Sequence, residues 1–218
     1  MRFLVTAGPT REYFDSVRFL SNPSSGKMGY RIAAQAAARG HHVELVSGPV
    51  DLPEPKGVRL TRVVSAAEMF EAVVSRFSMC DVIIMAAAVC DYRPARRSVH
   101  KMKKRRVGFE VRLLPTPDIL AHLGRVKVRQ VVIGFAMEDH DHHAHAELKL
   151  KRKQCDAIVM NGLGNVGSDK AEVQVLLASE GWQKPIRGRK TSVSARLVKL
   201  AESLASECKK QAQPIIFS

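Results

Sequence analysis

Two short segments of the chain contain polar or small residues that could bind a ligand, and both lie in loops next to predicted strands or helices. In the first, Asn22 is followed by Ser24-Ser25-Gly26-Lys27-Met28, and a segment with helical periodicity comes next. Backbone N–H groups at a helix start, two hydroxyl donors and a lysine charge suit the binding of a phosphate. The GxxxxGK[ST] spacing of a Walker A loop is absent, so a phosphate site and a plain capped loop fit these residues equally well.

In the second string, three alanines follow a buried apolar run that ends at Met85. Ala86, Ala87 and Ala88 would let a flat group lie against the backbone, and Asp91 offers acceptors to a ribose or a base amine. The alternative is structural: the alanines pack against a helix and Asp91 caps a turn. The residues alone do not separate these two interpretations.

Two further patterns resemble known sites but lack the expected context. Residues 162–167 form a literal GxGxxG after an apolar run, but a strand-like segment follows, so no helix start is predicted to bind a pyrophosphate. The string from His140 to His145 contains four histidines. These fan around an exposed helix start, and solvated histidines are a better interpretation than a metal site.

Composition narrows the classes of function. The net charge of +14 favours anionic partners, which include nucleic acid, acidic lipid and phosphorylated small molecules. Aromatic residues make up only 6%, so stacking platforms for single-stranded nucleic acid are scarce. The four cysteines form no CxxC pair, and no run is long enough to span a bilayer. These features predict a reduced, cytoplasmic protein that binds neither nucleic acid nor membranes.

The elements that must position these residues alternate between strand and helix. Continuous apolar strands indicate a buried parallel sheet, so the predicted fold is a three-layer, doubly wound (Rossmann-like) α/β domain covering residues 1–218. Ligands of such folds bind beyond the carboxyl ends of the strands. Strands are predicted at residues 2–6, 42–46, 81–85, 130–135, 157–160 and, at the sheet edge, 173–177; helices are predicted at 28–39, 66–77, 118–123, 139–153 and 192–208.

The segment from about residue 93 to 112 does not follow this alternation. It is polar and basic, and it separates a buried strand from a helix. Loops of this length in compact domains are usually lids or assembly elements, so we expect a flap or dimerisation segment here.

Several strings in this order and spacing resemble the phosphopantothenate–cysteine ligase family, in its stand-alone form. The resemblance runs from Arg2 to about Ala178 and is carried by TAGPTRE (6–12), VRFLSNPSSGKMG (17–29), LVSGPV (45–50), AAAVCDYRP (86–94), KMKK (101–104), PTPDIL (115–120) and GFAMED (134–139). It implies a ligase of coenzyme A synthesis that joins 4′-phosphopantothenate to L-cysteine through an acyl-cytidylate, with release of pyrophosphate and CMP. It also implies CTP as co-substrate, with ATP as the alternative nucleotide, Mg²⁺ held mainly by the nucleotide phosphates, and a homodimer. Because no decarboxylase segment precedes these motifs, no flavin is expected.

The resemblance also implies roles for individual residues. Asn22 matches an asparagine that contacts the acyl-nucleotidylate, and Lys101 matches a lysine on a flap that closes over the nucleotide. The implied substrate-binding residues are Asn22, Ser24, Ser25, Gly26, Lys27, Met28, Ala87 and Ala88. The implied nucleotide-binding residues are Met85, Ala86, Ala87, Asp91, Lys101, Pro117, Asp118, Ile119, Leu120, Phe135, Lys149 and Lys153.

The chain departs from the family pattern at Thr116, Met137, Gly162 and the 168–171 string, which puts the details of the late loop, residues 161–171, in question. Two other classes of protein are alternatives. A nicotinamide-dependent oxidoreductase needs a GxGxxG at the first strand–helix turn, which TAGPTRE does not supply. A basic nucleic-acid-binding module would explain the charge but not the buried sheet.

Overall fold

A nine-stranded sheet forms the centre of the computed structural model, which describes residues 1–104, 107–137, 141–165 and 167–211. Its order is β12-β11-β10-β9-β6-β1-β4-β5, with β13 also paired to β11. The six strands from β10 to β5 are parallel, and β11 to β13 join them antiparallel. The strands are β1 (Arg2–Ala7), β4 (His42–Ser47), β5 (Val58–Arg62), β6 (Val82–Met85), β9 (Val131–Ala136), β10 (Ala157–Asn161), β11 (Lys170–Leu177), β12 (Gly181–Trp182) and β13 (Ile186–Arg189).

Helices cover both faces of this sheet. On one face α1 (Lys27–Ala38) and α5 (Lys190–Gln211) pack on Val5, Ile84 and their neighbours. On the other face α2 (Ala66–Phe77), α3 (Ile119–Val126) and α4 (His142–Arg152) pack on a second apolar cluster that includes Leu4 and Ile83. Successive residues of each strand therefore enter different cores, and the predicted three-layer fold is confirmed.

Local sequence signals account for where α2 begins and where α1 ends. The hydroxyl of Ser65 accepts from the N–H of Glu68, and the Glu68 carboxylate accepts from the N–H of Val64, so α2 starts with a side-chain cap that resembles a capping box. α1 ends before Gly40, whose φ of 81° is in the left-handed region that glycine adopts most readily.

The sheet runs in two directions from its middle. The chain passes from β1 to β4 and β5 on one side, and then from β6 to β9 and β10 on the other. The strand order therefore reverses between β1 and β6, and the loops that leave these two strands separate there. In open α/β sheets this position is where ligands bind.

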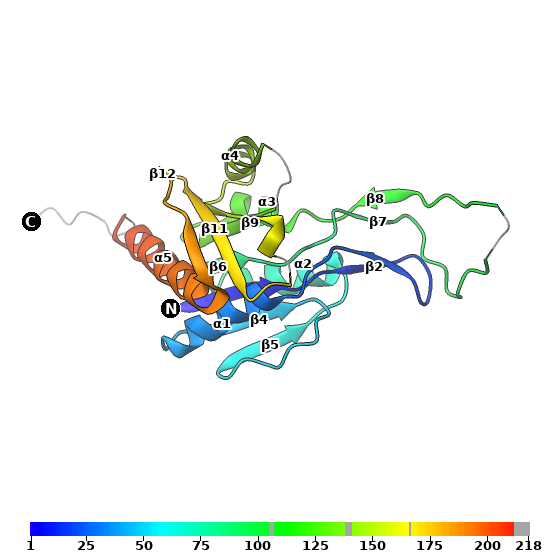
Figure 1. Ribbon diagram of the computed structural model, residues 1–218, viewed down its shortest axis with the longest axis horizontal. Coiled ribbons are helices and arrows are strands. Elements are labelled where there is room, and N and C mark those ends of the chain that lie inside the picture. The colour runs from blue at the N-terminus through cyan, green and yellow to red at the C-terminus, as the bar shows by residue number, and fades with distance from the viewer. Residues whose placement is uncertain (105–106, 138–140, 166, 212–218) are drawn as a thin grey trace, which may run out of the picture.

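An arm projects from the carboxyl edge of the sheet (Figure 1). It contains two antiparallel hairpins, one formed by β2 (Arg11–Tyr13) and β3 (Phe19–Ser21), and the other by β7 (Tyr92–Pro94) and β8 (Leu113–Pro115). The second hairpin carries at its end most of the predicted flap, residues 93–112. The segment thus leaves the layered body.

Two expectations about the sheet were wrong or incomplete. The predicted edge strand at 173–177 is part of β11, which pairs with β10 on one side and with β12 and β13 on the other. The opposite edge is β5, which the sequence does not signal because only Val58 and Leu60 are apolar in VRLTR. Of the described helices, none combines the length and apolarity needed to cross a bilayer.

Candidate active site

The loops that follow β1 and β6 are bonded to each other beyond the sheet. Ala88 N–H donates to the carbonyl of Gly8 at 2.9 Å, and Thr10 N–H donates to the carbonyl of Ala88 at 3.3 Å. The Thr6 hydroxyl accepts from Ala87 N–H at 3.1 Å, and the Thr10 hydroxyl accepts from the N–H of Cys90 at 2.9 Å. The alanine turn is therefore fixed in place by backbone and threonine contacts at the point where the strand order reverses.

Asn22 lies against this turn. It follows β3, and its Nδ2 donates to the carbonyl of Val89 at 3.0 Å and to that of Ala88 at 3.5 Å. Asn22 itself remains exposed. The Asn22 amide is thus hydrogen-bonded to the alanine turn, while the residue is accessible to solvent.

Three glycines let the first loop, the loop after β4 and the start of α1 approach closely. A Cβ on Gly48 would lie 1.7 Å from the carbonyl oxygen of Pro9, so no side chain fits there. Gly8 and Gly26 both have φ of 72°, and a Cβ on either would lie 2.8 Å from Val50 Cγ1. The three glycines are themselves buried, and they bring these turns against the start of α1, which has no side-chain cap.

The loop predicted to bind phosphate enters α1 at this place. Gly26 is its N-cap residue, and the N–H of Gly26 points to Ser24 Oγ at 3.4 Å. The Lys27 ammonium is turned toward the late loop, where it donates to Asp169 Oδ1 at 2.8 Å and to the carbonyl of Gly167 at 3.2 Å. Met28 accepts from the Ser194 hydroxyl on α5 at 3.7 Å. Lys27 is therefore engaged by a carboxylate and does not face the alanine turn.

A second cluster of predicted residues gathers at the start of α3. The Asp118 carboxylate caps the helix by accepting from Ala121 N–H at 2.9 Å, and it also pairs with Lys153 at the end of α4. Burial opposes ionisation of Asp118, but the hydrogen bonds from Lys153 and Ala121 and the charge of Lys149 outweigh it and hold the pKa below its usual range. Ion pairing thus brings together residues that are 35 positions apart.

Asp91 joins the alanine turn to the start of α3. Its carbonyl accepts from Thr116 N–H at 2.9 Å, which places it next to the Pro117 position. The side chains of Ile119 and Leu120 are buried in the core, so only their backbone can face a ligand. The same holds for Met85, which is 6% exposed. Half-buried Phe135 packs against the core on the face covered by α1 and α5.

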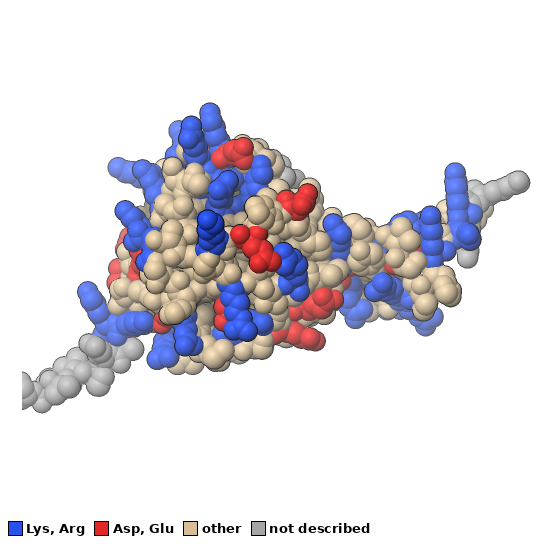
Figure 2. Space-filling model, turned by 90° about the horizontal axis from the view of Figure 1, so that it is seen from below, with Lys and Arg blue, Asp and Glu red and all other residues tan. Residues whose placement is uncertain are grey.

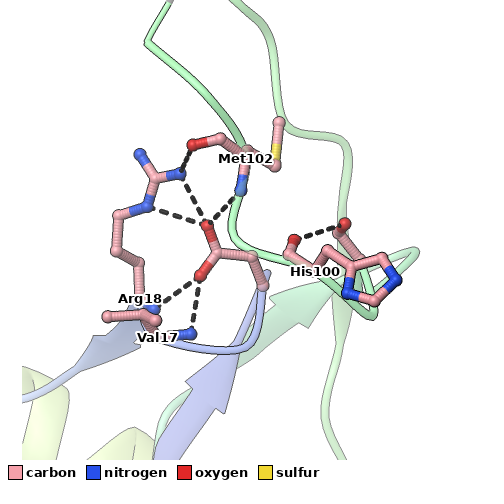
Figure 3. Close-up of polar contacts among 6 residues, drawn as sticks. Val17, Arg18, His100 and Met102 are labelled. Carbon is pink, nitrogen blue, oxygen red and sulfur yellow. Dashed lines mark hydrogen bonds and ion pairs between the residues drawn. The ribbon is translucent and has the colours of Figure 1, made fainter.

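A fully buried aspartate in the arm was not identified from the sequence. Asp15 accepts hydrogen bonds from the N–H groups of Val17 and Arg18, from the Arg18 guanidinium and, at 3.2 Å, from the N–H of Met102 (Figure 3). Burial raises the pKa of Asp15, but these donors outweigh it and hold the pKa well below the usual value. Arg18 also donates to the Met102 carbonyl at 2.6 Å. This contact ties the flap to the turn of the β2–β3 hairpin.

The structure does not bring Lys101 to Asn22 within this chain. Met102 is held by the outer turn of the β2–β3 hairpin, whereas Asn22 lies at its base, and the four residues from Arg18 to Asn22 span roughly 13 Å of extended strand. Figure 1 shows the flap continuing outward beyond this hairpin. Lys101 is exposed there.

No group of three or more His, Cys, Asp or Glu side chains suitable for a metal ion occurs among the residues described. His143 instead packs on Trp182, with ring centroids 4.2 Å apart, and its Nε2 lies 3.1 Å from Gln174 Oε1. His140 lies outside the described residues. The GxGxxG string at 162–167 contains a short 3₁₀ turn, Leu163–Asn165, and leads into β11 rather than a helix.

Basic side chains cover much of the body and recur along the arm, whereas acidic ones are seen mainly on the body (Figure 2). A cavity of about 580 Å³ lies at the opposite edge of the sheet, where β1 and β4 begin, and holds none of the predicted site residues. The turns after β1 and β6 and the starts of α1 and α3 thus form the candidate active site.

Comparisons with known proteins agree with this geometry. A family model described as the DNA/pantothenate metabolism flavoprotein C-terminal domain matches residues 1–204. The coenzyme A biosynthesis bifunctional protein CoaBC of Bacillus subtilis (strain 168) is 47% identical over 159 residues, which are 72% of this chain and 39% of that protein. The chain therefore spans well under half the length of this relative.

Solved structures give the same result. The crystal structure of the C-terminal domain of a coenzyme A biosynthesis bifunctional protein CoaBC has a TM-score of 0.80 and 38% identity, covering 94% of this chain and 96% of that one. A Cab2 variant in complex with phosphopantothenate-cysteine has a TM-score of 0.82 at 15% identity, covers 98% of this chain and 89% of that one, and shares the fold alone. The chain belongs to the family of the C-terminal domain of DNA/pantothenate metabolism flavoproteins, the family to which its sequence motifs pointed.

Proposed function

We propose that this chain is a phosphopantothenate–cysteine ligase of coenzyme A synthesis, with the site between β1 and β6 as its active site. The observation that supports this most strongly is the position of Asn22, whose amide is bonded to the alanine turn where the strand order reverses. Family membership and the name of the CoaBC relatives agree with it.

The first step activates a carboxylate. An oxygen of the 4′-phosphopantothenate carboxylate attacks the α-phosphorus of CTP, the bond to the β-phosphate breaks, and pyrophosphate leaves. Two polyanions must be held in contact for this step, so positioning and cationic groups should dominate catalysis. The backbone N–H groups at the start of α1, which has no side-chain cap, and the lysine pair Lys149 and Lys153 are the groups we assign to phosphate binding.

The second step forms the amide. The cysteine amine attacks the acyl carbon of the acyl-cytidylate, CMP leaves with the C–O bond electrons, and the amine loses a proton. Negative charge develops on the acyl oxygen during this attack. We assign the Asn22 amide to the stabilisation of this oxygen, because Asn22 is exposed and its amide is already held against the alanine turn.

The remaining nucleotide contacts are assigned by position. The alanine turn at Ala86-Ala87-Ala88 and the carboxylate of Asp91 would receive the base and ribose, and the backbone from Pro117 to Leu120 would lie along the nucleotide. Mg²⁺ would be held by the phosphates, since Mg²⁺ keeps several waters and often uses few protein ligands. CTP is the proposed nucleotide because KMKK resembles the CTP-using form of the family.

We further propose that the enzyme is a cytoplasmic homodimer in which the arm of one copy reaches the site of the other. Lys101 lies far from Asn22 in its own chain, so the flap lysine at each active site would come from a second copy. The arm also exposes large apolar side chains, as expected of an interface; these are Val17, Phe19, Leu20, Tyr92, Val99, Val107, Phe109, Val111 and Leu113. Light scattering should give twice the chain mass, and Val107→Glu should lower it.

The proposed reaction is tested by pyrophosphate release. Protein, Mg²⁺ and 4′-phosphopantothenate are incubated with CTP or ATP, with and without cysteine. Release that depends on both the triphosphate and the substrate is expected, and its absence with either nucleotide would overturn the proposal.

Two variants test the assigned roles. Asn22→Asp should leave nucleotide binding intact but slow the later step, because a carboxylate would face the Val89 carbonyl and repel the developing oxyanion. Lys101→Gln should slow pyrophosphate release while the melting temperature stays unchanged. Wild-type turnover in Lys101→Gln would refute the flap role without affecting the assignment of Asn22.

A further inference from the structure

A second cavity lies beside the candidate active site and is lined almost entirely by basic residues. Its volume is about 320 Å³, and it is formed where the starts of α1 and α5 meet the late loop. Five cations and one carboxylate line it: Lys27, Arg31, Lys170, Arg189, Lys190 and Asp169, with Thr191 completing the wall. We call it the basic pocket.

The basic residues of the pocket lie where the first turns of α1 and α5 would ordinarily favour acidic side chains. Helix starts carry partial positive charge and favour acidic residues, yet neither α1 nor α5 has an acidic residue in its first turn. Each begins with a lysine instead, Lys27 in α1 and Lys190 in α5. Positions where a sequence breaks a local rule without structural gain are often functional sites.

Lys190 is held in place inside this arrangement. It is 6% exposed, and its ammonium donates to the carbonyls of Asn165 at 2.7 Å and Ser168 at 2.6 Å. Its ammonium bonds to no carboxylate among the described residues; burial and the nearby charge of Lys27 lower its pKa, and the charge of Asp169 opposes this only in part. A buried cation whose hydrogen-bond partners are neutral carbonyls leaves part of its positive charge uncompensated.

Asp169 supplies the pocket's carboxylate and is weakly placed to neutralise it. Its side chain is 85% exposed and bonds to Lys27 at 2.8 Å. An anion that enters the pocket would therefore compete with Asp169 for Lys27. Because Lys27 also belongs to the loop that enters α1, the pocket and the candidate active site share this one residue.

We propose that the basic pocket is an accessory anion site that takes a compact phosphate-bearing small molecule, separate from the nucleotide and substrate positions between β1 and β6. Its volume is at the small end of the range for ligand sites, and its lining contains cations but no aromatic side chain, so a phosphate or diphosphate group suits it better than a nucleotide base. Mixed lysines and arginines supply both point charges and planar donors for phosphate oxygens.

The test is a calorimetric titration of the protein with inorganic pyrophosphate, carried out at low and at raised ionic strength. The double variant Arg31→Gln/Arg189→Gln should weaken binding about tenfold or more, because both side chains are exposed cations of the pocket. Its control, Lys151→Gln/Lys199→Gln, removes the same charge from exposed helix positions outside the pocket and should change affinity by less than about twofold. Unchanged melting temperatures verify folding of both.

A third variant is expected to increase the affinity for pyrophosphate. Asp169→Asn removes the carboxylate from the pocket wall and should tighten pyrophosphate binding about threefold or more. Equal weakening in both double variants would mean that only net charge matters, and this would overturn the proposal. The proposal would also be overturned if only the double variant Asn22→Ala/Lys153→Gln lost pyrophosphate binding, because the anion would then bind between β1 and β6. Ligase turnover is a separate readout, so failure of the proposed reaction is distinguishable from failure of this site.

Discussion

Replacement of Glu202 by glutamine tests how α5 is held against the helix that leads from the candidate active site. Glu202 on α5 bonds Arg39, at the end of α1, through both carboxylate oxygens at 2.7 and 2.6 Å, and it also bonds His41 Nε2 at 2.6 Å. The Arg39 hydrogen bonds, partly opposed by burial, lower the pKa of Glu202 from 4.5 to about 2. The carboxylate is therefore a stabilising contact wherever it is ionised.

The size of this contribution follows from the pKa. A displacement from 4.5 to about 2 corresponds to about 3.4 kcal/mol in the limit of full burial. Glu202 is 19% and Arg39 36% exposed, so solvent screens the pair. We therefore expect Glu202→Gln to lower the free energy of unfolding by about 1–2 kcal/mol, and the melting temperature by roughly 2–8 °C.

The pH dependence gives the sharper test. Because the folded-state pKa is depressed, the contribution is fully present above the unfolded pKa of 4.5 and is lost as pH falls toward about 2. Urea unfolding of wild type and variant should differ at about pH 7, and at about pH 3 more than half of that difference should be gone. Glu207→Gln, at an exposed position of the same helix, is the control. A difference equal to the control, or one that persists at low pH, would refute the reasoning.

Three further changes probe the arm, the sheet and the second cluster. Asp15→Asn should reduce ligase turnover about tenfold or more, because it loosens the flap anchor; turnover is measured below the melting temperature of the variant, and an unaffected rate would contradict it. Gly29→Ala should cost about 1–3 kcal/mol in urea unfolding, since its Cβ would lie 2.6 Å from that of Ala7; Gly162→Ala, with nothing within 4 Å, is the control. Lys153→Gln should raise the KM for the nucleotide about tenfold and change kcat less; a rise confined to kcat would count against a binding role.

The body of the fold was predictable because its signals are local. Continuous apolar strands such as VIIM and the helical period of 66–77 identify elements without knowledge of their partners. The helix at 66–77 has the predicted bounds, together with its Ser65 cap. The mainly parallel, doubly wound arrangement then follows from alternation alone.

The arm and the edges of the sheet depend on contacts that the chain does not signal locally. β2, β3, β7 and β8 are three residues each, too short for periodicity to register. Asp15 stands two residues before Val17 in a polar turn, and only its distant partner Met102 shows that it joins two hairpins. A buried carboxylate of this kind can be found once the backbone brings residues 87 positions apart together.

The position of the candidate site could be predicted from the sequence, but the contacts of its charged side chains could not. Asn22, the alanine turn and Asp91 were placed at strand ends, and the structure brings them to one turn. The charge of Lys27 was assigned to the same place, but it is taken by Asp169, whose proximity depends on the late loop. Lys101 was expected near the nucleotide, and the single chain leaves it on the arm.

The reversal of strand order between β1 and β6 divides the site between two segments of the chain. The amino-terminal part contributes Asn22 and the glycine turns, while the segment from β6 onward contributes the alanine turn and the pair Asp118–Lys153. Neither fragment alone would contain a complete binding surface. Pieces severed between β5 and β6 should therefore regain ligand affinity only on reassociation, which makes this domain suited to fragment complementation.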